Sequence, residues 1–362
     1  MKIVQIISRM NLGGTATWIN TLDSQLAKDG HEIHLIYGPT FAPEIEADIK
    51  NPQSSYLIRG LGKGSGFISS IRAFFAIRGL VTKINPDLVN THTSKAGFLG
   101  RIAVFSIGRK RPALVHTFHG HVLTGYFSKA KSFVIQLTER FLGNLTDLIL
   151  VAGKQVSVEL LDRSVVRSEK LRIVYPGVHY HSNLVKSRKN DSRLAIGWLG
   201  RLTNIKRPDR VIEIANTFSE IEFVIGGSGE LEDSLRKIAP RNVTFLGWVS
   251  PEAFWPKVDI ALLTSENEAM PYSLIEAGLQ GLPAVTTNVG STSEVVLDSK
   301  TGFVVGQQVD ALSQAINKLI SNPELILQMG SAAKTWAQDN FSPTKMASLH
   351  LRIYQEAIAL KK

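Results

Sequence analysis

The chain of 362 residues contains no cysteine. This absence excludes disulfide bonds, thiolate metal ligands and a cysteine nucleophile, and it is typical of cytosolic proteins. The sequence also lacks a long uncharged apolar run. Its most apolar segment, near 67–81, contains Arg72 and Arg78, which argues against a plain membrane span. The apolar run that follows Met1 is too short to predict a signal peptide.

Several ligand-binding motifs are missing as well. The dinucleotide fingerprint G-x-G-x-x-G and the Walker spacing of Gly-Lys-Ser/Thr are absent, which argues against a dehydrogenase and a P-loop enzyme. No Asp-x-Asp pair is present to hold a metal–diphosphate complex. His116, His119 and His121 crowd one strand end, but no carboxylate lies close to them in the sequence, so we expect neither a metal nor a cofactor.

The positive charge is uneven. Residues 1–180 hold 22 Lys and Arg against 12 Asp and Glu, whereas residues 181–362 hold 19 of each. A basic half can meet nucleic acid, an anionic membrane surface or another polyanion, and it can equally be an ordinary solvated surface. No nucleic-acid readout module is recognisable, so we expect no nucleic-acid partner.

Short β-branched runs alternate with helical patterns along the whole chain, which predicts two α/β units with parallel sheets. Strands are expected at 2–7, 32–37, 87–91, 113–118 and 147–151, and at 194–199, 221–226, 242–246, 259–263 and 283–287. The polar, patternless segment after residue 178 predicts a linker. The expected domains are therefore 1–178 and 179–342, with 343–362 forming a helix that crosses back to the first domain.

Two features suit phosphate groups. Gly13 and Gly14 follow the first strand, where backbone amides at a helix start can approach an anion. Arg201 and Lys206 follow strand 194–199, and two cations at the carboxyl end of a strand suit a diphosphate. Each feature also has a plain interpretation, as a tight turn and as a charged surface loop.

Two glutamates complete the pattern. Glu268 lies just before the expected helix 271–280, and Glu276 lies about two turns along it. Carboxylates accept hydrogen bonds from vicinal sugar or ribose hydroxyls, and the helix start near 270–273 offers free amides for phosphate. The alternative is two solvated glutamates on one helix face.

These residues resemble the E-x7-E signature of GT-B glycosyltransferases, and most closely the retaining glycosyltransferase family 4. The resemblance covers nearly the whole chain. It includes Gly13-Gly14, the segments 90–97, 117–121 and 175–178, Gly200-Arg201 with Lys206, 226–229, Glu268-x7-Glu276, and Gly290-x3-Glu294. It implies two Rossmann-like domains that face each other across a cleft. The chain departs from the family pattern at Ala16, Ala269 and Ser291.

The resemblance also implies roles for individual residues. Arg201 and Lys206 would bind the donor diphosphate, Glu276 the ribose, and Glu268 and His119 the transferred sugar. The donor-binding set is then Gly13, Gly14, Arg201, Lys206, Met270, Pro271, Tyr272, Ser273 and Glu276, and the catalytic set is His119, Glu268, Arg201 and Lys206. On the acceptor side we place His92, Ser94, Lys95 and His121.

The expected activity is retaining transfer of a hexosyl or N-acetylhexosaminyl group from a nucleotide-sugar to an acceptor hydroxyl. A UDP-linked donor is expected first and a GDP-linked donor second. The basic N-terminal half predicts a lipid-linked saccharide acceptor in surface polysaccharide synthesis, at the inner face of the cytoplasmic membrane. A non-catalytic nucleotide-sugar-binding subunit and a GT-B sugar-nucleotide epimerase stay open as alternatives.

Overall fold

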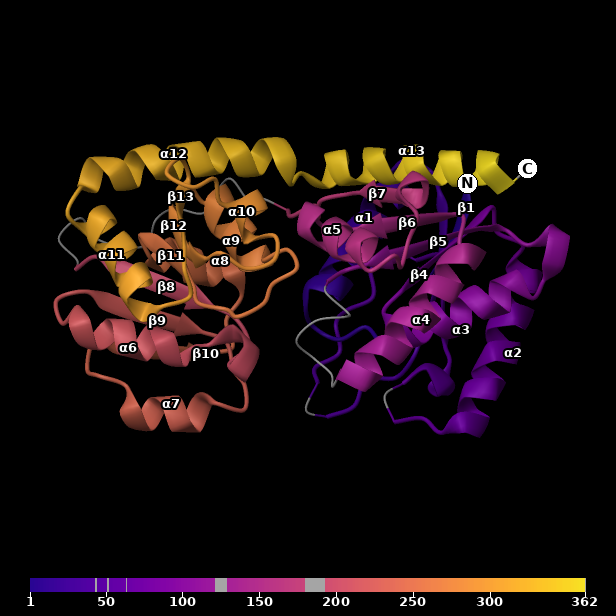
Figure 1. Cartoon of the computed structure of the whole chain (residues 1–362), viewed down its shortest axis with the longest axis horizontal. Coiled ribbons are helices and arrows are strands. Elements are labelled where there is room, and N and C mark those ends of the chain that lie inside the picture. Colours follow the sequence, from indigo (N-terminus) through magenta and orange to yellow (C-terminus); the bar gives the residue numbers. More distant parts are fainter. Residues whose placement is uncertain (43, 51, 63, 121–128, 180–192, 362) are drawn as a thin grey trace. The chain divides into compact units, whose positions relative to one another are not determined.

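The computed structural model describes residues 1–361 except 43, 51, 63, 121–128 and 180–192. The chain divides into two compact α/β units (Figure 1). Unit 1 comprises Met1–Gly177 together with Pro343–Lys362, and unit 2 comprises Val178–Ser342. The excess charge lies on unit 1, which contains 26 Lys and Arg against 13 Asp and Glu, while unit 2 contains 15 against 18.

Unit 1 is built on one parallel sheet with the strand order β3-β2-β1-β4-β5-β6-β7. The strands are β1 (Lys2–Ile7), β2 (Glu32–Tyr37), β3 (Ser54–Leu57), β4 (Leu88–His92), β5 (Ala113–Phe118), β6 (Leu148–Val151) and β7 (Leu171–Ile173). The helices are α1 (Gly14–Lys28), α2 (Phe67–Ile84), α3 (Ser94–Phe105), α4 (Lys129–Leu145), α5 (Lys154–Asp162) and α13 (Pro343–Lys361), with short 3-10 turns at Arg59–Leu61, Gly108–Lys110 and Ser168–Lys170. The central strands are buried throughout because helices cover both faces of the sheet.

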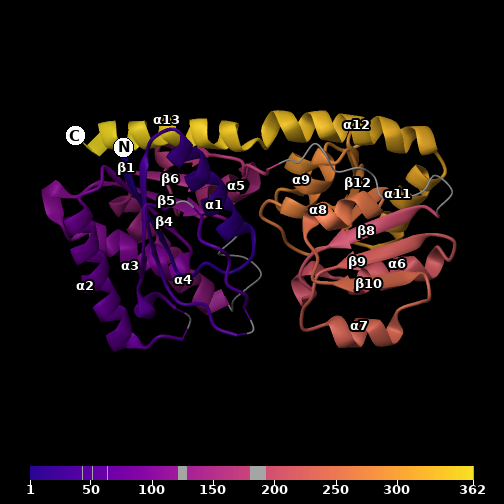
Figure 2. The same cartoon turned by 180° about the vertical axis from the view of Figure 1, so that it is seen from behind.

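Alternation along the strands separates two different layers of unit 1. Val4 and Ile6 pack with α2 and α3 in an apolar cluster on one face of the sheet. Their neighbour Gln5 points to the opposite face, where it bonds to Asp23 of α1. Both views place α13 beside α1 (Figures 1 and 2). This second layer therefore contains buried polar side chains between the sheet and the pair α1 and α13.

Specific contacts hold α13 in unit 1. The amide Nδ2 of Asn90 donates to the Tyr354 hydroxyl at 2.9 Å, and Arg172 pairs with Glu356. At the start of the helix, a Cβ on Gly177 would lie 2.6 Å from the Cα of Pro343, so only glycine permits this approach.

Unit 2 has a second parallel sheet with the order β10-β9-β8-β11-β12-β13. Its strands are β8 (Ala195–Leu199), β9 (Glu222–Gly226), β10 (Val243–Gly247), β11 (Ile260–Leu263), β12 (Ala284–Thr287) and β13 (Gly302–Val305). Its helices are α6 (Asp209–Thr217), α7 (Glu232–Ile238), α8 (Pro251–Phe254), α9 (Tyr272–Leu279), α10 (Thr292–Val295), α11 (Val309–Ile320) and α12 (Pro323–Asn340), with 3-10 turns at Asn204–Lys206 and Trp255–Lys257. The helices α6 and α11 cover one face of this sheet in a large apolar core.

The predicted α/β architecture is confirmed, and every expected strand has a counterpart within one or two residues of the predicted bounds. The strands β3, β7 and β13 and the helices α5, α8 and α10 have no counterpart among the predicted ranges. β3 is half-exposed and lies at the edge of its sheet, so it lacks the continuous apolar run that identifies a buried strand.

Candidate functional site

In unit 2, two of the predicted residues contact each other directly. Lys206 Nζ donates to Glu268 Oε1 at 2.6 Å, and Ser265 Oγ donates to the same oxygen at 2.6 Å. Glu268 is only 7% exposed, whereas the Lys206 side chain keeps 31% of its surface exposed. The ammonium group therefore neutralises a buried carboxylate and remains accessible to a ligand.

The Lys206 loop is held by groups that the sequence pattern did not reveal. Thr264 Oγ1 lies 3.0 Å from the carbonyl oxygen of Lys206 and 2.8 Å from that of Arg207, and it accepts from Trp198 Nε1 at 3.0 Å. Arg210 Nη1 donates to the Thr264 carbonyl at 2.7 Å. These bonds tie the loop after β8 to the loop after β11, and so bring Lys206 to Glu268.

Arg201 lies in the same loop and is exposed. It makes no ion pair within the described part of the chain, so its guanidinium is available to an anion. The glycine-rich turn after β9 supports the loop, because Leu202 N donates to the Ser228 carbonyl at 3.0 Å. Gly227 has φ 118°, and a Cβ there would lie 1.9 Å from the carbonyl oxygen of Gly200. The close packing of these two turns therefore requires glycine.

Glu276 occupies a different environment from Glu268. Burial raises the pKa of Glu276 to about 8, so near neutral pH its carboxyl is mostly protonated. The Trp255 indole lies close enough to lower that pKa slightly, yet its buried Nε1 makes no hydrogen bond of normal geometry. Within the described part of the chain, the buried hydroxyl of Tyr272 has no hydrogen-bond partner. Two buried donors thus lie near a carboxyl that can accept ligand hydroxyls.

The helix α9 begins one residue later than predicted, at Tyr272, with the buried Pro271 before it. The first amides of this helix, at Tyr272 and Ser273, have no intrahelical acceptor, which is the general condition of a helix start. Met270 is 6% exposed, and its neighbour Ala269 accepts a hydrogen bond from Ser291 N at 3.2 Å. This contact braces the loop between Glu268 and α9.

In unit 1, the predicted glycines lie at the start of α1. Gly13 precedes the helix and Gly14 is its first residue, and both are exposed. Thr17 N and Oγ1 both bond to the Gly13 carbonyl, which fixes the first turn. The turn therefore offers backbone amides without side chains in front of them.

The histidines of unit 1 differ sharply in exposure. His119 follows β5 and is half-buried, and Trp18 packs edge-on against its ring at 5.1 Å between centroids. His92 is fully buried, with its two ring nitrogens 2.8 Å from His119 Nε2 and 2.9 Å from Gln5 Oε1. Both ring nitrogens of His92 thus bond within the fold, and its place on the acceptor side stays a prediction. His116 is also buried and bonds to Thr91 Oγ1 at 2.8 Å.

The remaining acceptor-side predictions lie at the start of α3. Ser94 is exposed at its first position. Lys95 Nζ donates to the Gly62 carbonyl at 3.2 Å and to Ser65 Oγ, so this lysine bonds to two residues that lie shortly before α2. His121 lies outside the described residues.

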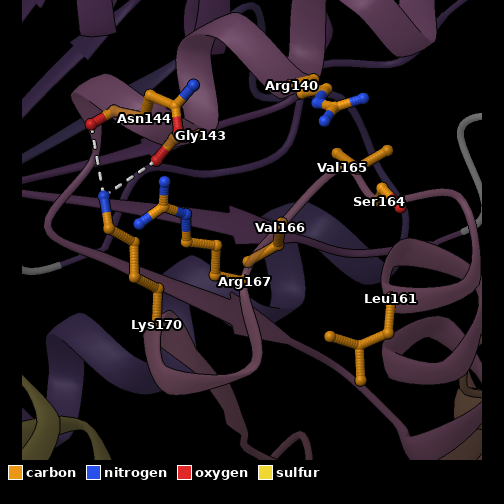
Figure 3. Close-up of a pocket in the computed structure, with 9 residues that line it drawn as sticks. All are labelled: Arg140, Gly143, Asn144, Leu161, Ser164, Val165, Val166, Arg167 and Lys170. Carbon is orange, nitrogen blue, oxygen red and sulfur yellow. Dashed lines mark hydrogen bonds between the residues drawn. The ribbon is translucent and has the colours of Figure 1, made fainter.

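A basic cavity of about 290 Å³ lies elsewhere in unit 1. Arg140, Arg167 and Lys170 line it, beside the end of α4. Figure 3 shows Lys170 reaching the carbonyls of Gly143 and Asn144, and it also bonds to the Thr146 carbonyl at 2.7 Å. Lys170 therefore satisfies the carbonyls at the C-terminal end of α4, which explains its position without a ligand.

No metal-binding group of three His, Asp or Glu residues is found among the described residues. None of the described helices is both long and apolar enough to cross a membrane.

Comparison with known proteins matches each unit to a family. Residues 12–182 match Glycosyltransferase Family 4, and residues 182–336 match Glycosyl transferases group 1. This chain is a GT-B glycosyltransferase of the family 4 type. The two matches together cover residues 12–336, which include the strands of both sheets except β1.

Several proteins similar to this chain are named for the biosynthesis of O-antigen or capsular polysaccharide. The O-antigen biosynthesis glycosyltransferase WbnH of Escherichia coli is 23% identical, over 88% of this chain and 90% of that protein. The UDP-Gal:alpha-D-GlcNAc-diphosphoundecaprenol alpha-1,3-galactosyltransferase of E. coli is 26% identical, over 74% of each chain. The solved structure of Anabaena HepE in complex with UDP shares the fold, with a TM-score of 0.76 and 18% identity over 98% of this chain and 100% of that one.

Proposed function

We propose that this glycosyltransferase transfers a sugar from a UDP-sugar to a hydroxyl of a lipid-diphosphate-linked saccharide, with retention at the anomeric carbon, in surface polysaccharide synthesis. The observation that carries the proposal is the cluster after β8 and β11. There Lys206 pairs with the buried Glu268 at 2.6 Å, and α9 begins shortly after Glu268. Arg201 is exposed and makes no ion pair with any residue that the structure describes. Cations for a diphosphate and carboxyls for sugar hydroxyls thus occupy adjacent loops.

The donor assignment draws on the same residues. Lys206 and Arg201 would bind the two phosphates, with the amides of Tyr272 and Ser273 as further donors. Glu276 would accept hydrogen bonds from the ribose. A UDP complex of HepE, which has the same fold, supports UDP as the first nucleotide to test, with GDP second.

In unit 1, Gly13 and Gly14 would approach the donor phosphates, and His119 would contact a hydroxyl of the transferred sugar. Glu268 of unit 2 would also contact hydroxyls of that sugar. The acceptor would be recognised by unit 1, where Ser94 is exposed at the start of α3. The E. coli galactosyltransferase named for a diphosphoundecaprenol-linked acceptor supports this class of substrate.

The proposed mechanism is a front-face displacement. The bond between the anomeric carbon and the diphosphate oxygen breaks, the acceptor oxygen bonds to that carbon on the same face, and the leaving phosphate takes the acceptor's proton. Negative charge develops on the leaving diphosphate, where Lys206 and Arg201 stabilise it electrostatically. Glu268 would orient the sugar by its hydroxyls rather than attack it, because Glu268 is almost fully buried and already accepts two hydrogen bonds.

Unit 1 also presents apolar side chains beside its positive charge. On α2, Phe67 is 81% exposed and Phe75 63% exposed, beside the exposed Arg72. On α4, Phe133 and Phe141 are exposed. We propose that α2 and α4 bind the anionic inner face of the cytoplasmic membrane, where a lipid-linked acceptor would be found.

Flotation with vesicles tests the membrane proposal. We expect binding to vesicles of phosphatidylglycerol and phosphatidylethanolamine that weakens as salt is raised, and weaker binding by Phe67→Ser/Phe75→Ser. A matched control is Leu327→Ser, since Leu327 is 72% exposed on unit 2. Equal flotation with neutral vesicles, or none with anionic ones, would reject membrane binding.

Transfer assays test the activity. Thermal-shift screening against UDP- and GDP-sugars identifies the donor, and the best donor is then incubated with polyprenyl-diphosphate saccharides. A new glycolipid with a retained anomeric configuration is expected. Donor binding without transfer or hydrolysis would favour a non-catalytic subunit, and conversion of the free nucleotide-sugar to its epimer would favour an epimerase.

A further inference from the structure

A chain of hydrogen-bonded side chains crosses the second layer of unit 1 and ends at His119. Gln5 of β1 donates from Nε2 to Asp23 Oδ1 of α1 at 2.9 Å. Gln5 Oε1 lies 2.9 Å from His92 Nε2, at the end of β4, and His92 Nδ1 lies 2.8 Å from His119 Nε2. Asp23, Gln5 and His92 are 0–1% exposed, so bulk water does not compete for these bonds.

The donor and acceptor atoms of these side chains fix the direction of each hydrogen bond. Asp23 accepts at Oδ1 whether or not its other oxygen is protonated, so the Gln5 amide turns its NH2 group to Asp23 and its carbonyl oxygen to His92. An amide oxygen only accepts, and His92 must therefore carry its hydrogen on Nε2 and a lone pair on Nδ1. Burial lowers the pKa of both histidines, that of His119 to about 3, so both rings are neutral.

We infer that Asp23, Gln5 and His92 are positioning residues that hold His119 in the Nε2–H tautomer, so that its Nδ1 accepts a hydrogen bond from a hydroxyl of the transferred sugar. This inference rests on the proposed function, in which His119 contacts that sugar. Trp18 packs edge-on against the His119 ring at 87° and restricts its rotation. An unprotonated Nδ1 also confers specificity, because a donor sugar without the matching hydroxyl leaves this acceptor unpaired.

Other polar groups of the layer border these side chains, and the Tyr354 hydroxyl interacts with Gln5. Asn90 bonds to Tyr354 at 2.9 Å and accepts from Thr117 at 3.0 Å. On the opposite face of the same strands, Thr91 bonds to His116 and takes no part in the chain. Thr91→Val therefore removes the buried hydrogen bonds of Thr91 Oγ1 to His116 and to the Val115 carbonyl, and it serves as a matched control.

Nitrogen-15 histidine NMR tests the tautomer directly. Two-bond correlations of the full-length protein distinguish the protonated from the unprotonated ring nitrogen, and His119 is assigned by its loss in His119→Ala. We expect Nε2–H on His119 in the wild type and in Thr91→Val. In Gln5→Leu the acceptor for His92 is gone, and we expect His119 to shift towards Nδ1–H. Wild-type His119 in the Nδ1–H form, or no change in Gln5→Leu, would overturn the inference.

Because Gln5→Leu leaves the buried Asp23 carboxyl without its donor, the double variant Gln5→Leu/Asp23→Leu is measured beside it as a folding safeguard. Both should lower kcat by about tenfold and change the KM for the donor less than about twofold, since Arg201, Lys206 and Glu276, the side chains proposed to bind the diphosphate and ribose, lie in unit 2. Adding His119→Ala to either variant should cause little further loss, because the residues act through one group.

The two proposals fail differently. If His119→Ala transfers sugar at the wild-type rate while the NMR result holds, the proposed contact of His119 with the sugar is wrong and the tautomer assignment stands. If His119→Ala is impaired but the Gln5 variants keep wild-type kcat, the positioning role is wrong and the proposed function stands.

Discussion

Nucleotide binding should change the protonation of Glu276. Burial raises the pKa of Glu276 to about 8, so its carboxyl is about nine-tenths protonated at about pH 7. Ribose hydroxyls donate hydrogen bonds to the ionised form, which lowers this pKa in the complex. UDP binding near neutral pH should therefore release a proton from the protein.

The size of the effect follows from the shift of the Glu276 pKa. At about pH 7 the protein should release about 0.9 proton on binding UDP, and at about pH 9 only about 0.1. Deprotonation one unit below the pKa costs about 1.4 kcal/mol, so UDP should bind about tenfold more tightly at about pH 9 than at about pH 7. The raised pKa has the opposite effect on folding: unit 2 loses stability as the pH rises from the ordinary carboxyl value to about 8.

Isothermal titration calorimetry measures the released proton. UDP is titrated into the protein in buffers of different ionisation enthalpy, and the slope of the heat against that enthalpy counts the protons. Glu276→Gln is the matched control, because it keeps the shape, cannot ionise, and corrects for protons released by UDP itself. The same heat in every buffer at about pH 7, or an unchanged proton count in Glu276→Gln, would refute the reasoning.

Three further substitutions test other contacts. Lys206→Met should lower turnover at least tenfold and reduce the free energy of unfolding by about 1–2 kcal/mol, because the buried Glu268 loses its charged partner; Lys237→Met, at an exposed lysine of α7, should change neither in the same assays. Gly227→Ala should weaken UDP binding about tenfold in calorimetry, because its Cβ would displace the turn that carries Arg201. A wild-type affinity would contradict the claim that the close packing of Gly227 on Gly200 positions Arg201. Arg101→Met leaves the buried carboxylate of Glu139 without its ion-pair partner and should lower the free energy of unfolding by about 3 kcal/mol. Circular dichroism should then show a melting temperature roughly 10 °C lower. A drop of only about one or two degrees would contradict this account of the Arg101–Glu139 ion pair.

Local patterns predicted the fold because the relevant physics is local. The strand at 2–7 is a nearly continuous apolar run, which is typical of a parallel strand covered on both faces, and it forms β1. The spacing of Glu268 and Glu276 places both around one helix start, and this too depends only on neighbouring residues. β13 escaped prediction because Gly302–Val305 is a short segment whose pairing with β12 defines it as a strand.

Contacts between distant segments could not be predicted from the sequence. Lys206 and Glu268 are 62 residues apart, and they meet because β8 and β11 are neighbours in the sheet and Thr264 binds the two loops together. His92 showed the same limit. Its bonds to Gln5 and His119 join segments that lie 87 and 27 residues away in the sequence.

The sequence by itself determined that the positive charge gathers in the first half, that two parallel sheets form, and that phosphate- and sugar-binding residue types follow their strands. Composition, periodicity and spacing are properties of neighbouring residues, so they can be read without a structure. Only the tertiary structure decided which of these residues are accessible and which are paired. Burial and hydrogen-bond direction depend on groups brought together from distant parts of the chain, as Asp23, Gln5, His92 and His119 are.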